Sequence, residues 1–323
     1  MARYLGGRIV QAAAVLWAAF TLTFAILYLL PSDPMELQLA AAGVQEDSLT
    51  PGQLAAMKHR FGLDQSIWQQ YWHHLAGVLH GDFGTSLSQQ VPVSDLIGQR
   101  IGQTLLLSGT AAVVSLLAGS ALAYLATFAR WNPLRVFLTR LPALGASFPQ
   151  FLVALFLIQF FSFQLGWFPA LGTQGIKSLV MPVVTISVLT SSVLAQVLIK
   201  SFDDTLRQPY IVTARAKGLS RTAVHVKHAF RNAALPAMTI LGVIVGLTVT
   251  SSIVTETVFT REGVGKLAQE SVLSQDVPVV LAVVTIAAAI FVLVNLVVDL
   301  LYPLLDPRIS HTRARPVPEV VTT

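Results

Sequence analysis

The sequence contains no cysteine and few charged residues. The absence of cysteine excludes disulfide bridges and thiolate metal ligands. Charged residues make up 11% of the chain, whereas an ordinary soluble domain carries roughly 25%. Hydrophobic residues make up 54%. This composition predicts a membrane protein.

The chain also lacks a nucleotide-binding or metal-binding motif. The nearest approach to a phosphate-binding loop is Gly263–Lys266, but Thr260 stands where the motif needs its first glycine, and Leu267 follows the lysine. Four histidines lie close together in the sequence: His59, His73, His74 and His80. Adjacent helical residues point to different sides of a helix, so His73 and His74 are interpreted as surface residues. We therefore expect no catalytic residue, no metal site and no cofactor in this chain.

Long apolar runs predict six membrane-spanning helices in an all-α, polytopic protein. The first run, 9–30, has 22 residues without a charge. As a helix it would be about 33 Å long, enough to cross a hydrocarbon core of about 30 Å. The other runs lie at 103–128, 136–163, 179–199, 236–258 and 279–303. Four prolines either break these helices around a translocation pathway or mark ordinary helix ends: Pro142, Pro149, Pro169 and Pro182.

Basic residues are distributed unevenly between the predicted loops. If the N-terminus is cytoplasmic, 15 of the 21 lysine and arginine residues fall on the cytoplasmic side. Because basic residues concentrate in cytoplasmic loops, both termini are expected in the cytoplasm. This asymmetry explains the net charge of +5, because the cytoplasmic basic residues would lie next to membrane lipid. We therefore expect no nucleic-acid partner.

The region between the first two spans is too long for a plain connector. A helix is expected from Thr50 to Gly62, and a second amphipathic helix follows Asp64 and ends before Gly81, with Tyr71 on its apolar face. Together they predict a small helical cap on the outer leaflet. The expected units are the N-terminus with the first span (1–30), the cap (31–100), a five-helix core (101–309) that includes the cytoplasmic loop 200–235, and a cytoplasmic tail (310–323).

The loop 200–235 holds the most informative stretch, 210–236. A short helix is expected over 211–217, and Gly218 would end it because glycine adopts a left-handed conformation at little cost. Ser220 would cap a second helix running towards Asn232, and Pro236 would begin the next span. The stretch is either a docking element for a cytoplasmic partner or a basic topology signal that touches only lipid headgroups.

The residues TARAKGLS (213–220) and HAFRNAALP (228–236) resemble the signature of permease subunits of binding-protein-dependent ABC importers. The resemblance is to the dipeptide/oligopeptide/nickel permease family, in particular to its dipeptide-type first permease subunit. Two departures from the general importer pattern, Val212 in place of its glutamate and the 18 residues between Gly218 and Pro236, are shared by this family. Other matching segments follow in the family's order: Leu30–Pro34, Phe61–Asp64, Gly81–Ser86, Leu165–Pro169, Val254–Phe259, Val292–Tyr302 and Leu305–Arg308.

The resemblance implies a type I ABC importer permease fold in the bacterial cytoplasmic (inner) membrane. Its implied partners are a second homologous permease, two cytoplasmic ATPases that alone bind ATP and Mg²⁺, and an extracytoplasmic substrate-binding protein. The implied cargo is a di- or oligopeptide, with nickel, glutathione, haem or another small solute as the alternative. The residues expected to couple the chain to the ATPases are Thr213, Ala214, Arg215, Ala216, Lys217, Gly218, Leu219 and Ser220.

Two other classes of protein are disfavoured by the sequence. A stand-alone secondary transporter would show inverted repeats and coupling acids near the midplane of the membrane. An intramembrane enzyme would need paired catalytic groups at membrane depth. The sequence shows neither pattern.

Four residues are candidates for the pathway or its gates: Pro149, Gln150, Glu256 and Asp299. An acid within a span is a functional candidate by default. Glu256, near the outer end of the fifth span, could bind the amino terminus of a peptide, or it could be an interfacial acid bonded to Thr255, Thr257 or a neighbouring helix. Asp299 lies near the inner end of the last span, where an arginine of the cytoplasmic face would be its partner.

Overall fold

The computed structural model describes residues 2–29, 50, 52–53 and 65–305. Within these ranges the chain is helical, and the one extended pairing is an isolated bridge between Thr85 and Pro92. The long helices are α1 (Ala2–Leu29), α5 (Val93–Phe128), α8 (Lys177–Leu206), α11 (Phe230–Val258) and α13 (Val277–Leu305). The predicted all-α class is confirmed.

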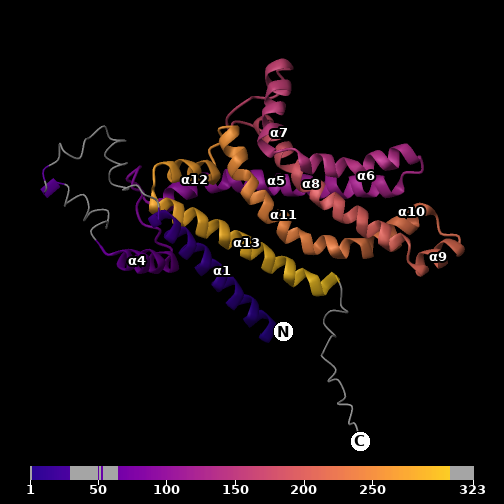
Figure 1. Ribbon diagram of the computed structural model, residues 1–323, viewed down its shortest axis with the longest axis horizontal. Coiled ribbons are helices and arrows are strands. Elements are labelled where there is room, and N and C mark those ends of the chain that lie inside the picture. Colours follow the sequence, from indigo (N-terminus) through magenta and orange to yellow (C-terminus); the bar gives the residue numbers. More distant parts are fainter. Residues whose placement is uncertain (1, 30–49, 51, 54–64, 306–323) are drawn as a thin grey trace, which may run out of the picture.

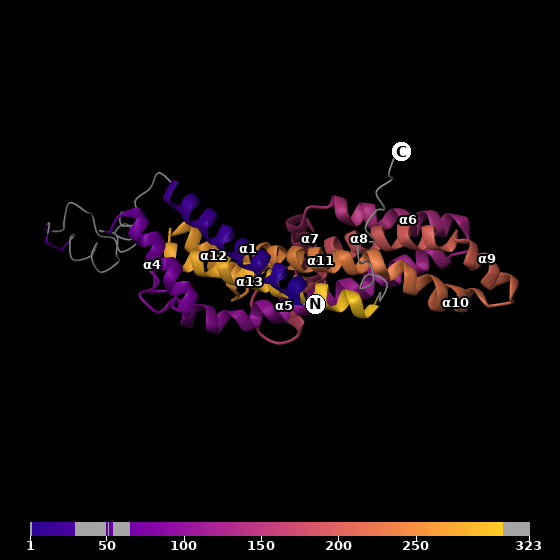
Figure 2. The same cartoon turned by 90° about the horizontal axis from the view of Figure 1, so that it is seen from below.

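The helices form an elongated bundle with two distinct ends. The shorter helices α4 (Ile67–His80) and α12 (Val264–Leu273) lie towards one end, and α9 (Pro209–Ala216) and α10 (Arg221–Ala223) lie at the other (Figures 1 and 2). α1 runs beside α13 along the bundle (Figure 1). The segments that attract functional interest therefore occupy opposite ends.

Four described helices are long and apolar enough to cross a membrane: Gly6–Leu27, Val93–Phe128, Lys177–Leu206 and Val277–Val297. A bent pair of helices provides a fifth candidate, and α11 contributes a shorter apolar stretch, Gly242–Val258. The multi-span architecture is therefore present, and the count of six spans stays a prediction.

The apolar run 136–163 is broken at Pro149, one of the four prolines expected to break a helix or to mark a helix end. The chain forms α6 (Asn132–Ser147), then α7 (Gln150–Leu157) and the π-helix η2 (Ile158–Gln164), with a bend of 98° between the two parts. The break falls at Phe148 and Pro149, because the ring of a proline pushes the preceding residue into an extended conformation, and Phe148 has φ −83° and ψ 127°. Pro142 and Pro182, by contrast, lie inside α6 and α8 without ending them.

The helix that contains the predicted span 236–258 begins well before Pro236. The backbone is helical from Arg221 to Val258, through α10, the π-helix η3 (Val224–Ala229) and α11. α5 likewise begins at Val93, inside the region assigned to the cap. Both helices are longer than their apolar runs, because their polar ends extend beyond the apolar residues on which the prediction was based.

Small residues bring α5 and α8 close together at the centre of the bundle. Gly119 lies against Ser191 and Leu194, and the hydroxyl groups of Ser115 and Thr190 are hydrogen-bonded across the interface. Membrane helices associate through such close backbone approach and interhelical hydrogen bonds, because lipid removes most of the hydrophobic driving force between them. Close backbone approach and a hydroxyl pair thus add to the apolar contacts of Leu107 and Ala111 of α5 with Val183 and Ile186 of α8.

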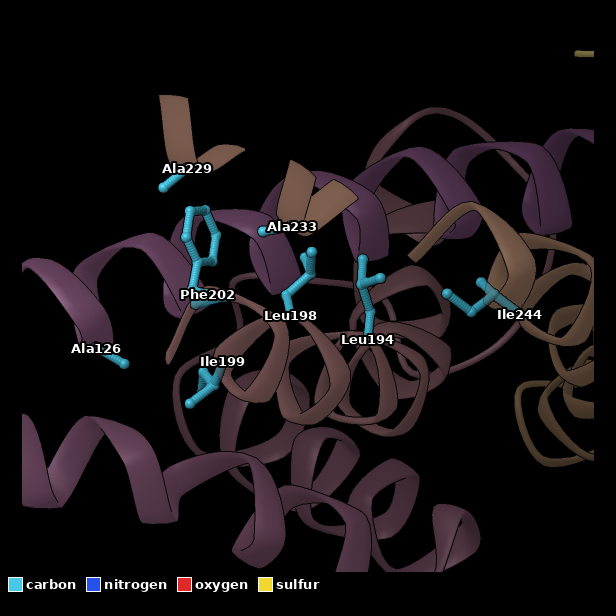
Figure 3. Close-up of a cluster of buried hydrophobic side chains, with 9 residues drawn as sticks. Ala126, Leu194, Leu198, Ile199, Phe202, Ala229, Ala233 and Ile244 are labelled. Carbon is cyan, nitrogen blue, oxygen red and sulfur yellow. The ribbon is translucent and has the colours of Figure 1, made fainter. Parts of the chain in front are cut away.

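A second set of buried side chains joins α8 to α5, η3 and α11. The cluster is apolar throughout, and its side chains gather between these helices (Figure 3). Its members are Ala123, Ala126, Leu194, Leu198, Ile199, Phe202, Ala229, Ala233 and Ile244. The helices that follow and precede α9 and α10 therefore share one core.

The predicted second helix of the cap is confirmed as α4. Ser66 caps it with Gln69 in a capping box, and Gly81 ends it with φ 78°. Tyr71 is buried against Phe20 of α1, and its hydroxyl is hydrogen-bonded to Thr21 at 2.9 Å. The predicted helix 50–62 falls largely outside the described residues, and the position of α4 on the outer leaflet stays a prediction.

The closeness of α5 and α8 can be tested at Gly119. A Cβ at this position would lie 2.8 Å from the carbonyl oxygen of Ser191. We expect Gly119→Ala to cost about 1–3 kcal/mol through overpacking and to lower the thermal unfolding midpoint of the detergent-solubilised protein. Gly109→Ala is the matched control in the same helix, since its Cβ would meet no atom within 4 Å. Equal midpoints for the two variants would contradict this packing.

Candidate functional site

The loop between α8 and α11, residues 207–229, folds as a helix, a glycine turn and a second helix, as predicted. We call it the α9–α10 loop. Lys217 ends α9, and Gly218 follows with φ +78°. Ser220 caps α10 by accepting a hydrogen bond from the backbone N–H of Ala223 at 3.2 Å. The turn thus depends on one left-handed residue and one capping side chain.

The loop has an apolar interior of its own. Ile211 and Ala214 from α9 are buried against Val224 of η3, with Leu206 and Leu219 packed around them. This interior holds the two short helices together as one unit.

The outer face of the loop carries most of the residues expected to meet the ATPases. Ala214 belongs to the interior, and Leu219 is half-buried. The remaining members of the predicted set are exposed: Thr213, Arg215, Ala216, Lys217, Gly218 and Ser220. Val212 adds an apolar side chain that is 63% exposed to this face. The exposed face therefore consists of small and basic residues, together with one apolar side chain.

His225 attaches the loop to the long helices. Its ring is buried among Tyr124 and Phe128 of α5 and Phe202 of α8, with centroid distances of 6.0, 5.2 and 6.4 Å. Burial lowers the pKa of His225, and the charges of Arg221 and Arg215 act in the same direction. The imidazole is therefore held neutral and packs as an aromatic ring between the loop and the bundle.

At the opposite end of the bundle, the buried carboxylate of Glu256 accepts three hydrogen bonds. Thr104 Oγ1 donates to one oxygen at 2.7 Å, and the backbone N–H groups of Gly265 and Lys266 donate to the other at 2.7 and 3.3 Å. Both N–H groups belong to the first turn of α12, where backbone donors have no partner inside the helix. Val264 N–H donates to Thr104 Oγ1 at 2.8 Å. Glu256 and Thr104 therefore cap α12 together.

Glycines make room for this carboxylate. A Cβ at Gly263 would overlap the carboxylate of Glu256, and a Cβ at Gly265 would lie 2.6 Å from Ile253 Cα. The segment Gly263–Lys266 therefore allows α12 to approach α11 closely. The geometry favours the interpretation of Glu256 as an acid bonded to neighbouring helices, although its partners are Thr104 and α12 rather than Thr255 or Thr257.

Arg261 extends the network beside this cap. It is 2% exposed; its Nη1 donates to the carbonyl oxygens of Gly172 and Ser178 at 3.3 and 3.0 Å, and its Nη2 donates to Gln103 Oε1 at 3.2 Å. Burial lowers the pKa of Arg261, and the charge of Glu256 opposes that shift. Arg261 thus ties the segment after η2 to the start of the apolar part of α5.

The other pathway candidates are placed as follows. Pro149 is exposed and begins α7, and Gln150 Nε2 donates to Ser251 O at 2.8 Å and to Thr255 Oγ1 at 2.6 Å. Gln150 thus holds α7 against α11, beside the residue that caps α12. The side chain of Asp299 lies outside the described residues. A pathway or gate function for these residues stays a prediction.

Asp276 is a buried residue that the sequence-based reasoning missed. Its carboxylate accepts hydrogen bonds from the hydroxyls of Ser86 and Ser88 at 2.6 and 2.7 Å, and from the N–H groups of Leu87 and Ser88 at 3.1 and 3.0 Å. It precedes the first residue of α13, a position where aspartate is a common helix cap. Its partners, however, lie 188 to 190 positions away, and no local pattern connects them.

Comparison with known proteins decides the family. Residues 103–311 match the family model described as "Binding-protein-dependent transport system inner membrane component". Residues 1–108 match the model of the N-terminal part of such membrane components. The chain belongs to this family. It is an inner-membrane permease subunit of a binding-protein-dependent ABC importer of the dipeptide/oligopeptide/nickel type, and such a system includes a substrate-binding protein and ATPases.

Curated relatives match the permease over almost its whole length. It is 38% identical over 313 residues to the glutathione transport system permease protein GsiC of Salmonella choleraesuis (strain SC-B67), covering 96% of this chain and all of that protein. The protein of the same name from Escherichia coli (strain K12) is 36% identical over the same coverage. A solved structure, "Crystal structure of an amino acid ABC transporter with histidines", is 18% identical with a TM-score of 0.49, covering 67% of this chain and 94% of that one.

The capping of α12 by Glu256 separates two interpretations of this acid. A glutamine side chain at this position would retain one acceptor oxygen and could not accept hydrogen bonds from both Thr104 and α12, so we expect Glu256→Gln to cost about 1–3 kcal/mol. The measurement is the thermal unfolding midpoint, with Glu270→Gln, which changes an exposed acid of α12, as the matched control. A raised KM for substrate with an unchanged midpoint would instead identify Glu256 as a substrate-binding group.

Proposed function

We propose that this permease subunit carries short peptides, glutathione among them, across the cytoplasmic membrane. Glutathione is itself a tripeptide, so a pathway for di- and oligopeptides and one for glutathione share the same backbone and carboxylate chemistry. Support comes from the end-to-end similarity to permeases whose names state glutathione transport. The segments of the sequence that resemble those of peptide permeases, several of which contain glycine or proline, favour the same class of cargo.

The α9–α10 loop is proposed to receive the movement of the partner ATPases, and its geometry is the observation that carries the mechanism. The exposed face of α9 would lie in a groove of an ATPase. Because Ile211, Ala214 and Val224 form one interior, the loop would move as a body. Its displacement would reach α8 through Phe202 and His225, and α11 through the helical backbone that continues from Arg221.

The proposed orientation places this loop and both termini in the cytoplasm. Support comes from the concentration of basic residues in the segments on that side. The opposite end, with α4 and α12 (Figure 1), would then face the substrate-binding protein. A second homologous permease would complete the pathway, and two ATPases would bind ATP and Mg²⁺.

Gly218 offers a test of coupling through its backbone conformation. A Cβ there would meet no other atom of this chain within 4 Å, so within the chain the positive φ is the main constraint on a substitution. A left-handed conformation costs an ordinary L-residue about 1–2 kcal/mol, whereas asparagine tolerates it better. In the reconstituted complex we expect Gly218→Val to lower the amount of peptide taken up per ATP hydrolysed several-fold, and Gly218→Asn to retain most of it. Equal uptake by both variants would contradict a coupling function of this turn.

The cargo is tested by stimulation of ATP hydrolysis. The complete importer in proteoliposomes is supplied with its own binding protein, loaded in turn with glutathione, dipeptides, longer peptides, a nickel chelate or haem. We expect glutathione or short peptides to stimulate ATP hydrolysis and to accumulate inside the vesicles. Stimulation by the nickel chelate or haem and by no peptide would overturn the proposed cargo and leave the importer architecture intact.

A further inference from the structure

Four arginines from four separate segments converge at the α9 end of the bundle. Arg130 lies in the turn between α5 and α6, Arg135 in α6, Arg215 in α9 and Arg221 in α10. Burial lowers the pKa of Arg221, and the positive charges of Arg130, Arg215 and Arg135 lower it further. The guanidinium of Arg221 lies 5.0 Å from the centre of the Phe128 ring at the end of α5. We call these four residues the arginine cluster.

The arginine cluster is poorly neutralised by the protein. Arg135 forms an ion pair with Asp203 of α8 at 3.3 Å. In the part of the chain that the structure describes, this is the one ion pair that the four arginines make. Like charges held close together repel one another, so an anion bound among these side chains would relieve that repulsion.

An exposed apolar surface adjoins the arginine cluster. Trp131 directly follows Arg130 and is 68% exposed, and Leu134 and Phe137, on either side of Arg135, are 41% and 57% exposed. Tryptophan is enriched where membrane hydrocarbon meets the headgroups, and α6 enters the bundle from this point (Figures 1 and 2). Cationic side chains next to an aromatic and aliphatic surface match a molecule that is anionic at one end and apolar at the other.

We propose that the arginine cluster and Trp131, Leu134 and Phe137 bind an anionic phospholipid of the inner leaflet. The phosphate would lie among the arginines, and the acyl chains would cover the apolar side chains. The proposal rests on the cytoplasmic orientation of the α9–α10 loop in the proposed function. It goes beyond that function because the lipid would join α6 to α9 and α10 and hold the loop in position for its ATPase.

A phospholipid fits this surface better than an ATPase does. An acidic protein surface could neutralise the arginines, but it would leave Trp131, Leu134 and Phe137 without an apolar partner. A phospholipid satisfies both parts with one molecule. Basic residues close to a membrane surface attract anionic lipid by about 1 kcal/mol each, roughly fivefold in local concentration.

Fluorescence quenching of Trp131 by brominated lipids tests the proposal directly. The permease–ATPase complex is reconstituted in phosphatidylcholine vesicles that contain an equal minor fraction of either brominated phosphatidylglycerol or brominated phosphatidylcholine. The signal of Trp131 is the difference between the wild-type complex and the Trp131→Phe complex. We expect the brominated phosphatidylglycerol to quench Trp131 several-fold more strongly than the brominated phosphatidylcholine does.

Charge-matched variants separate binding from general attraction to the membrane. Arg130→Gln combined with Arg221→Gln is expected to abolish the preference for phosphatidylglycerol, while quenching by phosphatidylcholine persists and reports an intact fold. Lys227→Gln removes a positive charge from an exposed side chain of the same loop, outside the set of charges that act on Arg221. It is expected to retain the preference.

Two outcomes would overturn the proposal. Equal quenching by the two lipids would mean that the arginines select no headgroup. Protection of Trp131 from both lipids only when the ATPases are present would assign this surface to the ATPase. The quenching needs no substrate, so a failure of the proposed peptide transport would leave it unchanged, and the two proposals can fail separately.

Discussion

Hydrocarbon offers no hydrogen-bond partners to a polypeptide, and this constraint orders the rest of the structure. It forces the spanning segments into helices, and it drives charged side chains to the two ends of the bundle. Between the ends, polar side chains such as the hydroxyls of Ser115 and Thr190 are paired. The segments of functional interest lie at the two ends, α12 at one and the α9–α10 loop at the other (Figure 1).

The two ends are connected by one helical path. The backbone is helical from Arg221 to Val258, and the 29 residues of α11 alone span about 44 Å. The loop lies at one end of this path, and Glu256, which caps α12, lies at the other. A rigid secondary element that touches both sites is one way in which a movement at one end can be felt at the other. The continuous helix through Pro236, where the next span was predicted to begin, gives the coupling mechanism such an element.

The sequence predicts those features that depend on neighbouring residues. Gly81, Gly218 and Ser220 act as stops and caps within a few positions of where they stand, and these predictions are confirmed. Features that depend on distant residues were missed. Asp276 meets Ser86 across 190 positions, and Gln150 of α7 bonds to Ser251 of α11 across 101 positions. Hydropathy measures length and apolarity, and neither quantity records such pairings.

In the α9–α10 loop, one set of residues determines the fold of the loop, and another attaches the loop to the long helices. Its shape depends on uncharged residues: the interior around Ile211 and the positive φ of Gly218. Its contacts with the bundle come from His225, which packs against the Phe128 ring, and from Arg221, whose guanidinium lies over the same ring. A basic loop that looks like a topology signal can therefore serve as one and still carry a specific geometry, because its fold depends on the buried side chains of Ile211 and Ala214 and on Gly218, and its exposed face carries the charges.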